Sequence, residues 1–196
     1  MAVHATEGAR RAQILGAAKR CFARKGYHET KVDDIVREAG LSKGALYWYF
    51  KSKEELLDAL CDSFVKETQE DFLKGSAVKT LDPDYLICDL GAMLMGRMLN
   101  DPEHRLIWME HWSMASRDAK GRKKVSEVHQ GWLDILVPLI KKNIKEGKLK
   151  PVDPRQLAMG LMSLFDGILT HRTFEDMDAP ALWRSTTRML LEGIRK

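Results

Sequence analysis

Residues 42 to 53 carry side chains whose types suit the backbone and the base edges of DNA. Lys43 is a cation that can reach a phosphate or a guanine edge, while Gly44 and Ala45 are small enough for close approach to base pairs. The hydroxyl groups of Tyr47 and Tyr49 can donate hydrogen bonds to phosphate oxygens. This stretch is therefore a candidate DNA-reading segment.

Two short helices and a tight turn are predicted to position these side chains. The first helix has a capping-box start at Thr30 and Asp33. Its apolar stripe follows at Val32, Ile35, Val36 and Ala39. Gly40 can take the left-handed conformation that ends a helix, and Ser42 can cap the next one. The spacing leaves a turn of about three residues, as in a helix-turn-helix.

The second helix, from Lys43 to about Tyr49, places Leu46 and Phe50 four residues apart, where both can face a core. A second capping box follows at Ser52–Glu55, so Lys53 lies in the first turn of a third helix. The amide groups of that turn could also hold a phosphate.

Charge separates this segment from the rest of the chain. Residues 1–53 carry eleven Lys or Arg against five Asp or Glu, a net charge of +6, whereas residues 54–196 have a net charge of −2. Paired capped helices also occur in helical proteins that bind no DNA. A basic N-terminal quarter on a near-neutral body favours a phosphate-binding module.

Residues 40–56, Gly-Leu-Ser-Lys-Gly-Ala-Leu-Tyr-Trp-Tyr-Phe-Lys-Ser-Lys-Glu-Glu-Leu, resemble the DNA-binding signature of TetR/AcrR-type transcriptional regulators. Residues 11–30 resemble the first helix of that family and its link to the second, so the likeness covers roughly residues 9–60. One departure is Tyr49, where the family most often has histidine; both side chains can donate to phosphate.

The resemblance implies phosphate contacts from Thr30, Ser42, Tyr47, Tyr49 and Lys53, with Lys43, Gly44 and Ala45 nearest the bases. The complete set of expected DNA-binding residues is Thr30, Lys31, Ser42, Lys43, Gly44, Ala45, Tyr47, Trp48, Tyr49 and Lys53.

The fold is predicted to be all-α with about nine helices, because helical spacing continues after residue 52 and no strand pattern competes. Breaks are expected at several Gly and Pro clusters, among them Gly75-Ser76 and Ala119-Lys120-Gly121. We divide the chain into a helix-turn-helix DNA-binding domain, 1–53, and a helical ligand-binding and dimerisation domain, 54–196. The expected helices beyond the first three are 53–73, 84–99, 103–118, 122–146, 154–173 and 179–195.

The composition argues against several other classes of protein: secreted, membrane-spanning and metal-binding ones. Cys21, Cys61 and Cys88 lie far apart without metal-ligand spacing, which fits small buried residues in a reducing cytosol. No stretch has the length of a signal peptide or a membrane span, so we expect a soluble cytoplasmic protein. His104 and His111 are a weak metal pair, and neither a metal nor a cofactor is expected.

The last two helices are the expected dimer contacts. Residues 153–172 carry two adjacent apolar stripes, of which one can serve the protomer and the other a partner; a helix wholly buried in a monomer is the alternative. The resemblance implies dimerisation through these helices as a four-helix bundle. The candidate interface residues are Leu157, Leu161, Leu164, Ile168, Trp183, Thr187, Leu190 and Ile194.

Large, soft side chains gather in the middle of the chain. Met and Trp can line an adaptable apolar pocket, although apolar stripes at helical spacing are more often plain core. The resemblance implies a ligand pocket in the helical bundle, and its ligand should be mainly apolar. The pocket candidates are Met93, Trp108, Glu110, Trp112, Trp132, Met162 and Phe165.

Three functions remain open on the sequence alone: a ligand-responsive DNA-binding repressor, a small-molecule carrier, and an enzyme. The chain has no Gly-rich phosphate loop, no paired-histidine helix motif and no nucleophile in a recognisable context, so we expect no enzyme. A carrier leaves the basic segment 30–53 unexplained. The favoured interpretation is a homodimer that reads an inverted repeat through helices about 34–36 Å apart, or a multiple of that distance, and responds to a small apolar effector.

Overall fold

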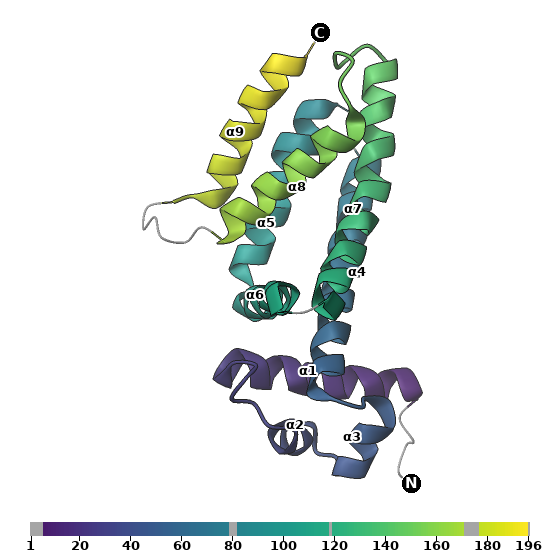
Figure 1. The fold of residues 1–196 in the computed structure, drawn as a ribbon, viewed down its shortest axis with the longest axis vertical. Helices are drawn as coiled ribbons and strands as arrows, with labels where there is room; N and C mark the ends of the chain where they lie inside the picture. Colours follow the sequence, from purple (N-terminus) through teal and green to yellow (C-terminus); the bar gives the residue numbers. More distant parts are fainter. Residues whose placement is uncertain (1–5, 79–81, 118, 171–176, 196) are drawn as a thin grey trace. The chain divides into compact units, whose positions relative to one another are not determined.

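The computed structural model describes residues 6–78, 82–117, 119–170 and 177–195, without the side chains of 76–78, 102, 104 and 111. This described part is all-α, as predicted: nine α-helices, one π-helical segment and a single isolated bridge between Leu149 and Arg195 (Figure 1). The elements are α1 Glu7–Lys25, α2 Val32–Ala39, α3 Lys43–Tyr49, α4 Lys53–Val78, η1 Asp84–Asp89, α5 Leu90–Asn100, α6 Pro102–Arg117, α7 Ala119–Lys145, α8 Pro154–Thr170 and α9 Ala179–Ile194.

The helices form two compact units. The first contains the chain up to Val65 and Asp101–Arg122, and the second contains Lys66–Asn100 and the chain from Lys123 onward. Helices α4 and α7 therefore each contribute residues to both units. The sequence-based division at residues 53 and 54 separates functions rather than packing units, and it stays a prediction.

In the first unit, α1, α2, α3, the first part of α4 and α6 enclose one hydrophobic core. Leu46 and Phe50 are fully buried in it, as their four-residue spacing predicts, together with Ile35 and Ala39 of α2. The other buried members are Ile14, Ala17, Ala18, Cys21, Phe22, Leu56, Leu57, Leu60, Cys61 and Ile107. This core holds α3 with one face buried and the opposite face exposed.

In the second unit, α9 lies along η1 and α5 and also packs against α8 (Figure 1). The Trp183 indole N–H donates to the Ile87 carbonyl at 2.8 Å, and Arg184 pairs with Asp89 at 3.0 Å. Gly91 makes room for this indole, because a Cβ at Gly91 would lie 2.4 Å from Trp183 Nε1. Contacts from the start of α9 thus fix it to the π-helical segment.

Three details of the helix boundaries differ from prediction. The expected break at Gly75-Ser76 is wrong, since α4 continues to Val78; Gly75 instead allows a close approach, because a Cβ there would lie 2.7 Å from Leu90 Cδ1. Gly121 likewise lies inside α7, against the backbone of Met114. The predicted helix 84–99 begins with a π-helical turn, for which the sequence has no signal. Residues 171–173, in the expected end of α8, lie outside the described residues.

Other expectations concern cysteines, metals and membranes. Cys21, Cys61 and Cys88 are buried, as predicted, and are not in disulfides. Within the described part no three His, Cys, Asp or Glu side chains gather closely enough to hold a metal ion. The side chains of His104 and His111 lie outside that part. None of the described helices is long and apolar enough to cross a membrane.

Candidate DNA-binding surface and ligand cavity

The turn between α2 and α3 has the predicted geometry. Gly40 adopts the left-handed conformation, with φ 64° and ψ 36°, and the Leu41 N–H donates to the Val36 carbonyl at 3.1 Å. Ser42 then caps α3, because its Oγ accepts from the Ala45 N–H at 3.2 Å. These local bonds fix the direction in which α3 leaves the turn.

The start of α2 differs from the predicted capping box. Lys31, not Thr30, is the N-cap residue, and the acidic partner is Asp34 rather than Asp33: the Lys31 N–H donates to Asp34 Oδ2 at 3.1 Å. The shift by one residue occurs because the Thr30 hydroxyl is used elsewhere. It is 1% exposed and donates toward the carbonyl oxygens of Gly26, at 2.7 Å, and Cys21, at 3.1 Å.

Helix α3 turns an unusual set of side chains to its surroundings. Trp48 is 78% exposed and Tyr47 is 39% exposed. Exposed aromatic rings leave apolar surface in water, which is unfavourable unless a partner covers them. Gly44 is also exposed, Ala45 is half-buried, and Tyr49 is half-buried against the core of the first unit. The exposed face of α3 is therefore available for contact with another molecule.

Lys43 on this face is held by an ion pair. Its Nζ lies 2.8 Å from Asp33 Oδ1, and that hydrogen bond raises the pKa of Lys43. Both side chains are more than half exposed, so the pair adds little to stability. A phosphate or guanine acceptor could replace Asp33 without leaving a buried charge unpaired. Lys31 and Ser42 are exposed nearby in the sequence.

Lys53 lies at the start of α4 and points into the loop between α1 and α2. Its ammonium donates to three backbone carbonyls: Tyr27 at 2.7 Å, Thr30 at 2.9 Å and His28 at 3.1 Å. It also lies over the Tyr27 ring, 4.4 Å from the centroid. Burial lowers the pKa of Lys53, and the charges of Glu110 and Glu29 act in the opposite direction.

This geometry gives Thr30 and Lys53 a different role from the phosphate contacts that the resemblance implies. The hydroxyl of Thr30 and the ammonium of Lys53 are hydrogen-bonded to backbone carbonyls of the α1–α2 loop. Neither side chain therefore presents a free donor to DNA in this conformation. The reason is tertiary: the loop crosses the first turn of α4, and its carbonyls need partners. In this structure the two residues position α2 and α3 from within.

Ion pairs also hold α2 against α1. Glu38 accepts from Arg20 at 2.8 Å and from Arg24 at 2.9 Å, and these bonds lower the pKa of Glu38. Lys25 pairs with Asp34 at 3.0 Å, which lowers the pKa of Asp34 together with the Lys31 N–H. These groups are solvent-accessible, so they contribute orientation more than stability.

The seven pocket candidates divide between the two units. In the first, Trp108 packs edge to face on Phe64 and on Trp112, with ring centroids 6.4 and 6.2 Å apart. His28 Nε2 lies 3.1 Å from Glu110 Oε1, a contact that is an ion pair only when the imidazole is protonated. The carboxylate of Glu110 thus lies beside the α1–α2 loop.

In the second unit, Met93 is 55% exposed and lines no described cavity. Trp132 packs edge to face on Phe72 at 5.7 Å, and Phe165 does the same on Trp183 at 5.3 Å. Met162 is half-buried beside the cluster of Leu149. Trp132, Met162 and Phe165 thus pack inside the second unit, whereas Met93 does not. All four stay predictions.

A small cavity lies inside the second unit, about 30 Å³ in volume. Its walls come from α4, η1, α7, α8 and the loop after α7. The lining residues are Phe72, Pro83, Leu86, Ile87, Leu136, Leu139, Ile140, Asn143, Leu149 and Leu161. None of the seven sequence candidates lines it, because helical spacing alone could not show which apolar faces would converge.

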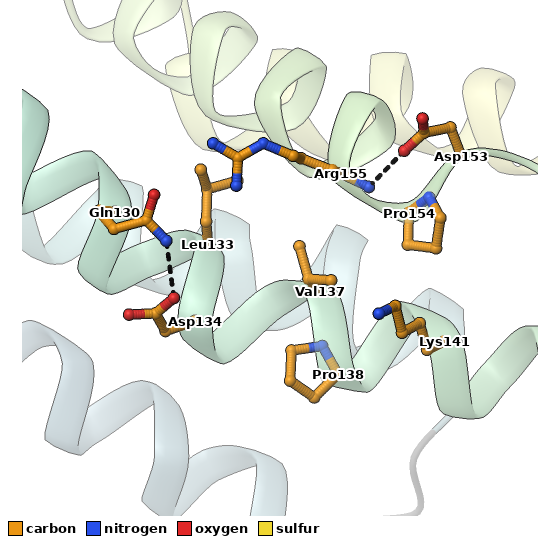
Figure 2. Close-up of a pocket in the computed structure, with 9 residues that line it drawn as sticks. All are labelled: Gln130, Leu133, Asp134, Val137, Pro138, Lys141, Asp153, Pro154 and Arg155. Atoms are coloured by element: carbon orange, nitrogen blue, oxygen red, sulfur yellow. Dashed lines mark hydrogen bonds between the residues drawn. The ribbon is translucent and has the colours of Figure 1, made fainter.

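A second cavity of about 450 Å³ is an open groove between α7 and the start of α8 (Figure 2). Asp153 caps α8 there by accepting from the Arg155 N–H at 2.8 Å, and Asp134 accepts from Gln130 at 2.7 Å. Lys141 and Arg155 add positive charge. Because both signs of charge line this groove, its chemistry favours neither an anionic nor a cationic ligand. Its lining residues are Gln130, Leu133, Asp134, Val137, Pro138, Lys141, Asp153, Pro154 and Arg155.

The structure buries half of the candidate dimer residues inside their own protomer. Leu161, Ile168, Trp183 and Thr187 are each at most 6% exposed. Leu157, Leu164 and Ile194 are half-buried, and only Leu190 is exposed, at 48%. The expected stripe therefore packs mainly on the protomer's own core. Its assignment to a partner stays a prediction.

The apolar residues exposed on α8 and α9 overlap with these candidates only at Leu190. The large ones are Met159, Leu182, Met189 and Leu190, each between 40% and 63% exposed. Gly160 and Gly193 lie in the same two helices, and a Cβ at either would meet no atom within 4 Å. The sequence carries a partial signal, since at helical spacing Leu182, Met189 and Gly193 lie beside the face of Trp183, Thr187, Leu190 and Ile194.

Two family descriptions match the chain. "Bacterial regulatory proteins, tetR family" matches residues 14–60, and "BetI-type transcriptional repressor, C-terminal" matches residues 92–195. Together they cover α2, α3 and most of the second unit, so the likeness is not confined to the helix-turn-helix.

Individual proteins are similar over most of their length. The "Fatty acid metabolism regulator protein" of Bacillus subtilis (strain 168) is 28% identical over 189 residues, which cover 93% of this chain and 94% of that protein. The transcriptional regulator TtgR of Pseudomonas putida is 28% identical over 81% of this chain and 78% of its own.

Solved structures have the same fold. A TetR transcription regulator from Haloarcula marismortui superposes with a TM-score of 0.84 at 20% identity, covering 96% of this chain and 100% of that one. FadR of Bacillus subtilis, solved in complex with stearoyl-CoA, superposes with a TM-score of 0.75 at 25% identity, covering 94% and 99%.

Proposed function

The chain belongs to the TetR family of bacterial transcriptional regulators, and we propose that it binds an inverted-repeat operator as a homodimer and leaves it when a small, mainly apolar ligand binds. The observation that carries the DNA-binding role is the exposed face of α3, with Trp48 78% exposed on a helix whose other face is fully buried. A carrier protein would have no use for that face. Because its target is genomic DNA, the proposed place of action is the cytoplasm.

On DNA, α3 would lie in the major groove with its N-terminal residues nearest the bases. Lys43 would exchange Asp33 for a phosphate or a guanine edge, and Gly44 would let the backbone approach. Tyr47, Trp48 and Tyr49 would follow the groove wall, where hydroxyl groups can donate to phosphates. The capped turn at Gly40 and Ser42 holds this helix in place before DNA arrives.

Replacing both Lys43 and Tyr47 by alanine should lower operator affinity by about tenfold to a hundredfold, because a charged and a neutral contact are lost. The slope of log affinity against log salt concentration should also fall by about 1 for the lost lysine–phosphate contact. Fluorescence anisotropy with an operator recovered from genomic fragments measures both quantities. Lys145→Ala, an exposed lysine at the end of α7, is the matched control. Unchanged affinity of the double variant would contradict this placement of the reading helix.

The proposed dimer contact is the exposed apolar surface of α8 and α9. An area with four large apolar side chains, each at least 40% exposed, is the kind that a partner normally covers. A two-fold dimer presents the same surface from both copies and pairs the two α3 helices for an inverted repeat.

Met189→Glu should dissociate the dimer, since Met189 is 63% exposed in the protomer and the variant would bury a charge against apolar neighbours. A cost of about 3 kcal/mol or more raises the dissociation constant over a hundredfold. Sedimentation equilibrium measures the constant, and Lys145→Glu on α7 is the control. If Met189→Glu formed the wild-type dimer, the interface would lie elsewhere.

The proposed ligand site is the small apolar cavity of the second unit. Its wall residue Ile87 belongs to η1, and the carbonyl of the same residue accepts from Trp183 of α9. A ligand that enlarged the cavity would move η1 and, through that bond, α9. A relative's complex with stearoyl-CoA supports a mainly apolar ligand class. The ligand must bind the DNA-free state more tightly, by the factor with which it weakens DNA binding.

A further inference from the structure

Trp48 is the most exposed large apolar side chain in the described part of the chain, at 78%. Tyr49 beside it is half-buried against the core of the first unit, whereas Trp48 does not pack on that core. Within the described residues the Trp48 indole also makes no hydrogen bond and no aromatic contact. An exposed tryptophan is characteristic of binding surfaces, because its rigid ring offers a large apolar area at little conformational cost.

The position of Trp48 on α3 turns its side chain away from the protein. Residues two apart on an α-helix lie about 200° apart around the axis, so Trp48 is nearly opposite Leu46. Leu46 is fully buried in the core of the first unit. Trp48 therefore lies on the face of α3 that the proposed operator complex turns toward the major groove.

Gly44 lies one helical turn before Trp48, on the same face of α3. A Cβ at Gly44 would meet no atom within 4 Å, and its φ is not positive. Glycine is less favourable than alanine in a helix, so packing and backbone geometry within the chain give no reason for it here. Gly44 leaves an open space beside Trp48 that another molecule can enter.

The chemistry of the major groove indicates what suits this ring. Base edges present hydrogen-bond donors and acceptors there, and one apolar group, the C5 methyl of thymine. An indole has one N–H donor and is otherwise apolar. When such a ring covers a polar base atom, that atom loses its water without gaining a hydrogen bond, which is unfavourable. The thymine methyl has no hydrogen bond to lose, so it matches the ring best.

We infer that Trp48 recognises a thymine of the operator by packing its ring on the C5 methyl group, with Gly44 leaving room for the base edge. The hydroxyl groups of Tyr47 and Tyr49 keep the phosphate contacts, which an indole on the groove wall does not need to make. This inference rests on the proposed operator binding and names a base that α3 reads. Trp48 thus determines sequence specificity in addition to affinity.

Deoxyuridine in place of thymine tests this contact, because it removes the C5 methyl group and keeps the base pair. Each thymine of the operator is replaced in turn, at equivalent positions of both half-sites, and fluorescence anisotropy measures the affinity. At one position the replacement should weaken wild-type binding by about fourfold per half-site, the effect of one buried methyl group. Trp48→Ala should bind the thymine and deoxyuridine operators equally. Lys43→Ala, the matched control, should bind both more weakly and keep the wild-type ratio.

Gly44→Ala is the second variant, since its methyl group meets no atom of the free protein. It should fold with at least wild-type thermal stability and show a reduced ratio, because the methyl group holds the base edge away from the ring. It also supplies the comparison if Trp48→Ala does not fold.

The inference would be overturned if wild type bound its operator specifically but discriminated at no thymine, and the proposed function would then stand. An unchanged ratio in both Trp48→Ala and Gly44→Ala would overturn it equally, and would assign the indole N–H to a phosphate. If wild type bound no operator at all, the proposed function and the inference would fail together.

Discussion

Replacing Trp183 by alanine is expected to lower the free energy of unfolding of the second unit by about 3–5 kcal/mol, the usual cost of truncating a buried tryptophan. The indole is 4% exposed, and its ring packs on Phe165 with centroids 5.3 Å apart. The variant also leaves the Ile87 carbonyl without its donor. Urea unfolding followed by circular dichroism measures the change.

A pair of glycine variants probes the same contact from the other side. Gly91→Ala would place a Cβ 2.4 Å from Trp183 Nε1, and such overpacking typically costs about 1–3 kcal/mol. Gly96→Ala in the same helix is the control, because its Cβ would meet Pro180 Cγ at an ordinary 3.5 Å.

If Trp183→Ala kept wild-type stability and only weakened the dimer, Trp183 would belong to the interface, as the sequence predicted.

Lys53→Met is expected to destabilise the first unit by about 1.5–3 kcal/mol, the range for hydrogen bonds to a charged group. Methionine keeps the length of the side chain but leaves the carbonyls of Tyr27, His28 and Thr30 without the ammonium that they share. Operator affinity should fall as a consequence, because the α1–α2 loop sets the position of the reading helices. Thermal unfolding and anisotropy measure the two effects.

The control is Lys51→Met, an exposed lysine whose Nζ donates only to the Tyr47 carbonyl among the described residues, at 3.1 Å. It removes the same charge at a neighbouring position and should leave stability nearly unchanged. If Lys53→Met kept its stability but lowered the salt slope of DNA binding by about 1, Lys53 would be a direct phosphate contact instead.

The turn at Gly40 shows what local sequence can predict. A left-handed glycine and a serine cap act over three or four residues, so their neighbours in the chain decide the geometry. The structure confirms both, together with the burial of Leu46 and Phe50. The face of α3 left exposed by that burial follows from the helical period alone.

Thr30 and Lys53 show the limit of local patterns. Each is typical of a helix start, and the pattern predicts a cap or a phosphate contact. The structure gives their donors to carbonyls that are between 4 and 26 residues away in sequence. Only the path of the α1–α2 loop decides this, because a donor bonds to whichever acceptors the fold brings within about 3 Å.

For the apolar helices α8 and α9, the sequence pattern is limited for a different reason. Their circumference is apolar on more than one face, so periodicity predicts burial without saying which face packs on the protomer. The π-helical turn Asp84–Asp89, Gly91 and Trp183 settle that choice by close contact, which leaves Met189 and Leu190 outside.

The sequence by itself determined the helical fold, the capped turn and the exposed side of α3, because each depends on periodicity or on bonds between near neighbours. The tertiary structure alone decided the inward direction of Thr30 and Lys53, the core position of Trp183 and the small cavity of the second unit. These depend on which surfaces meet. One sequence pattern is compatible with several arrangements of the apolar helix faces. Only the packing of the helices against one another decides which faces are buried.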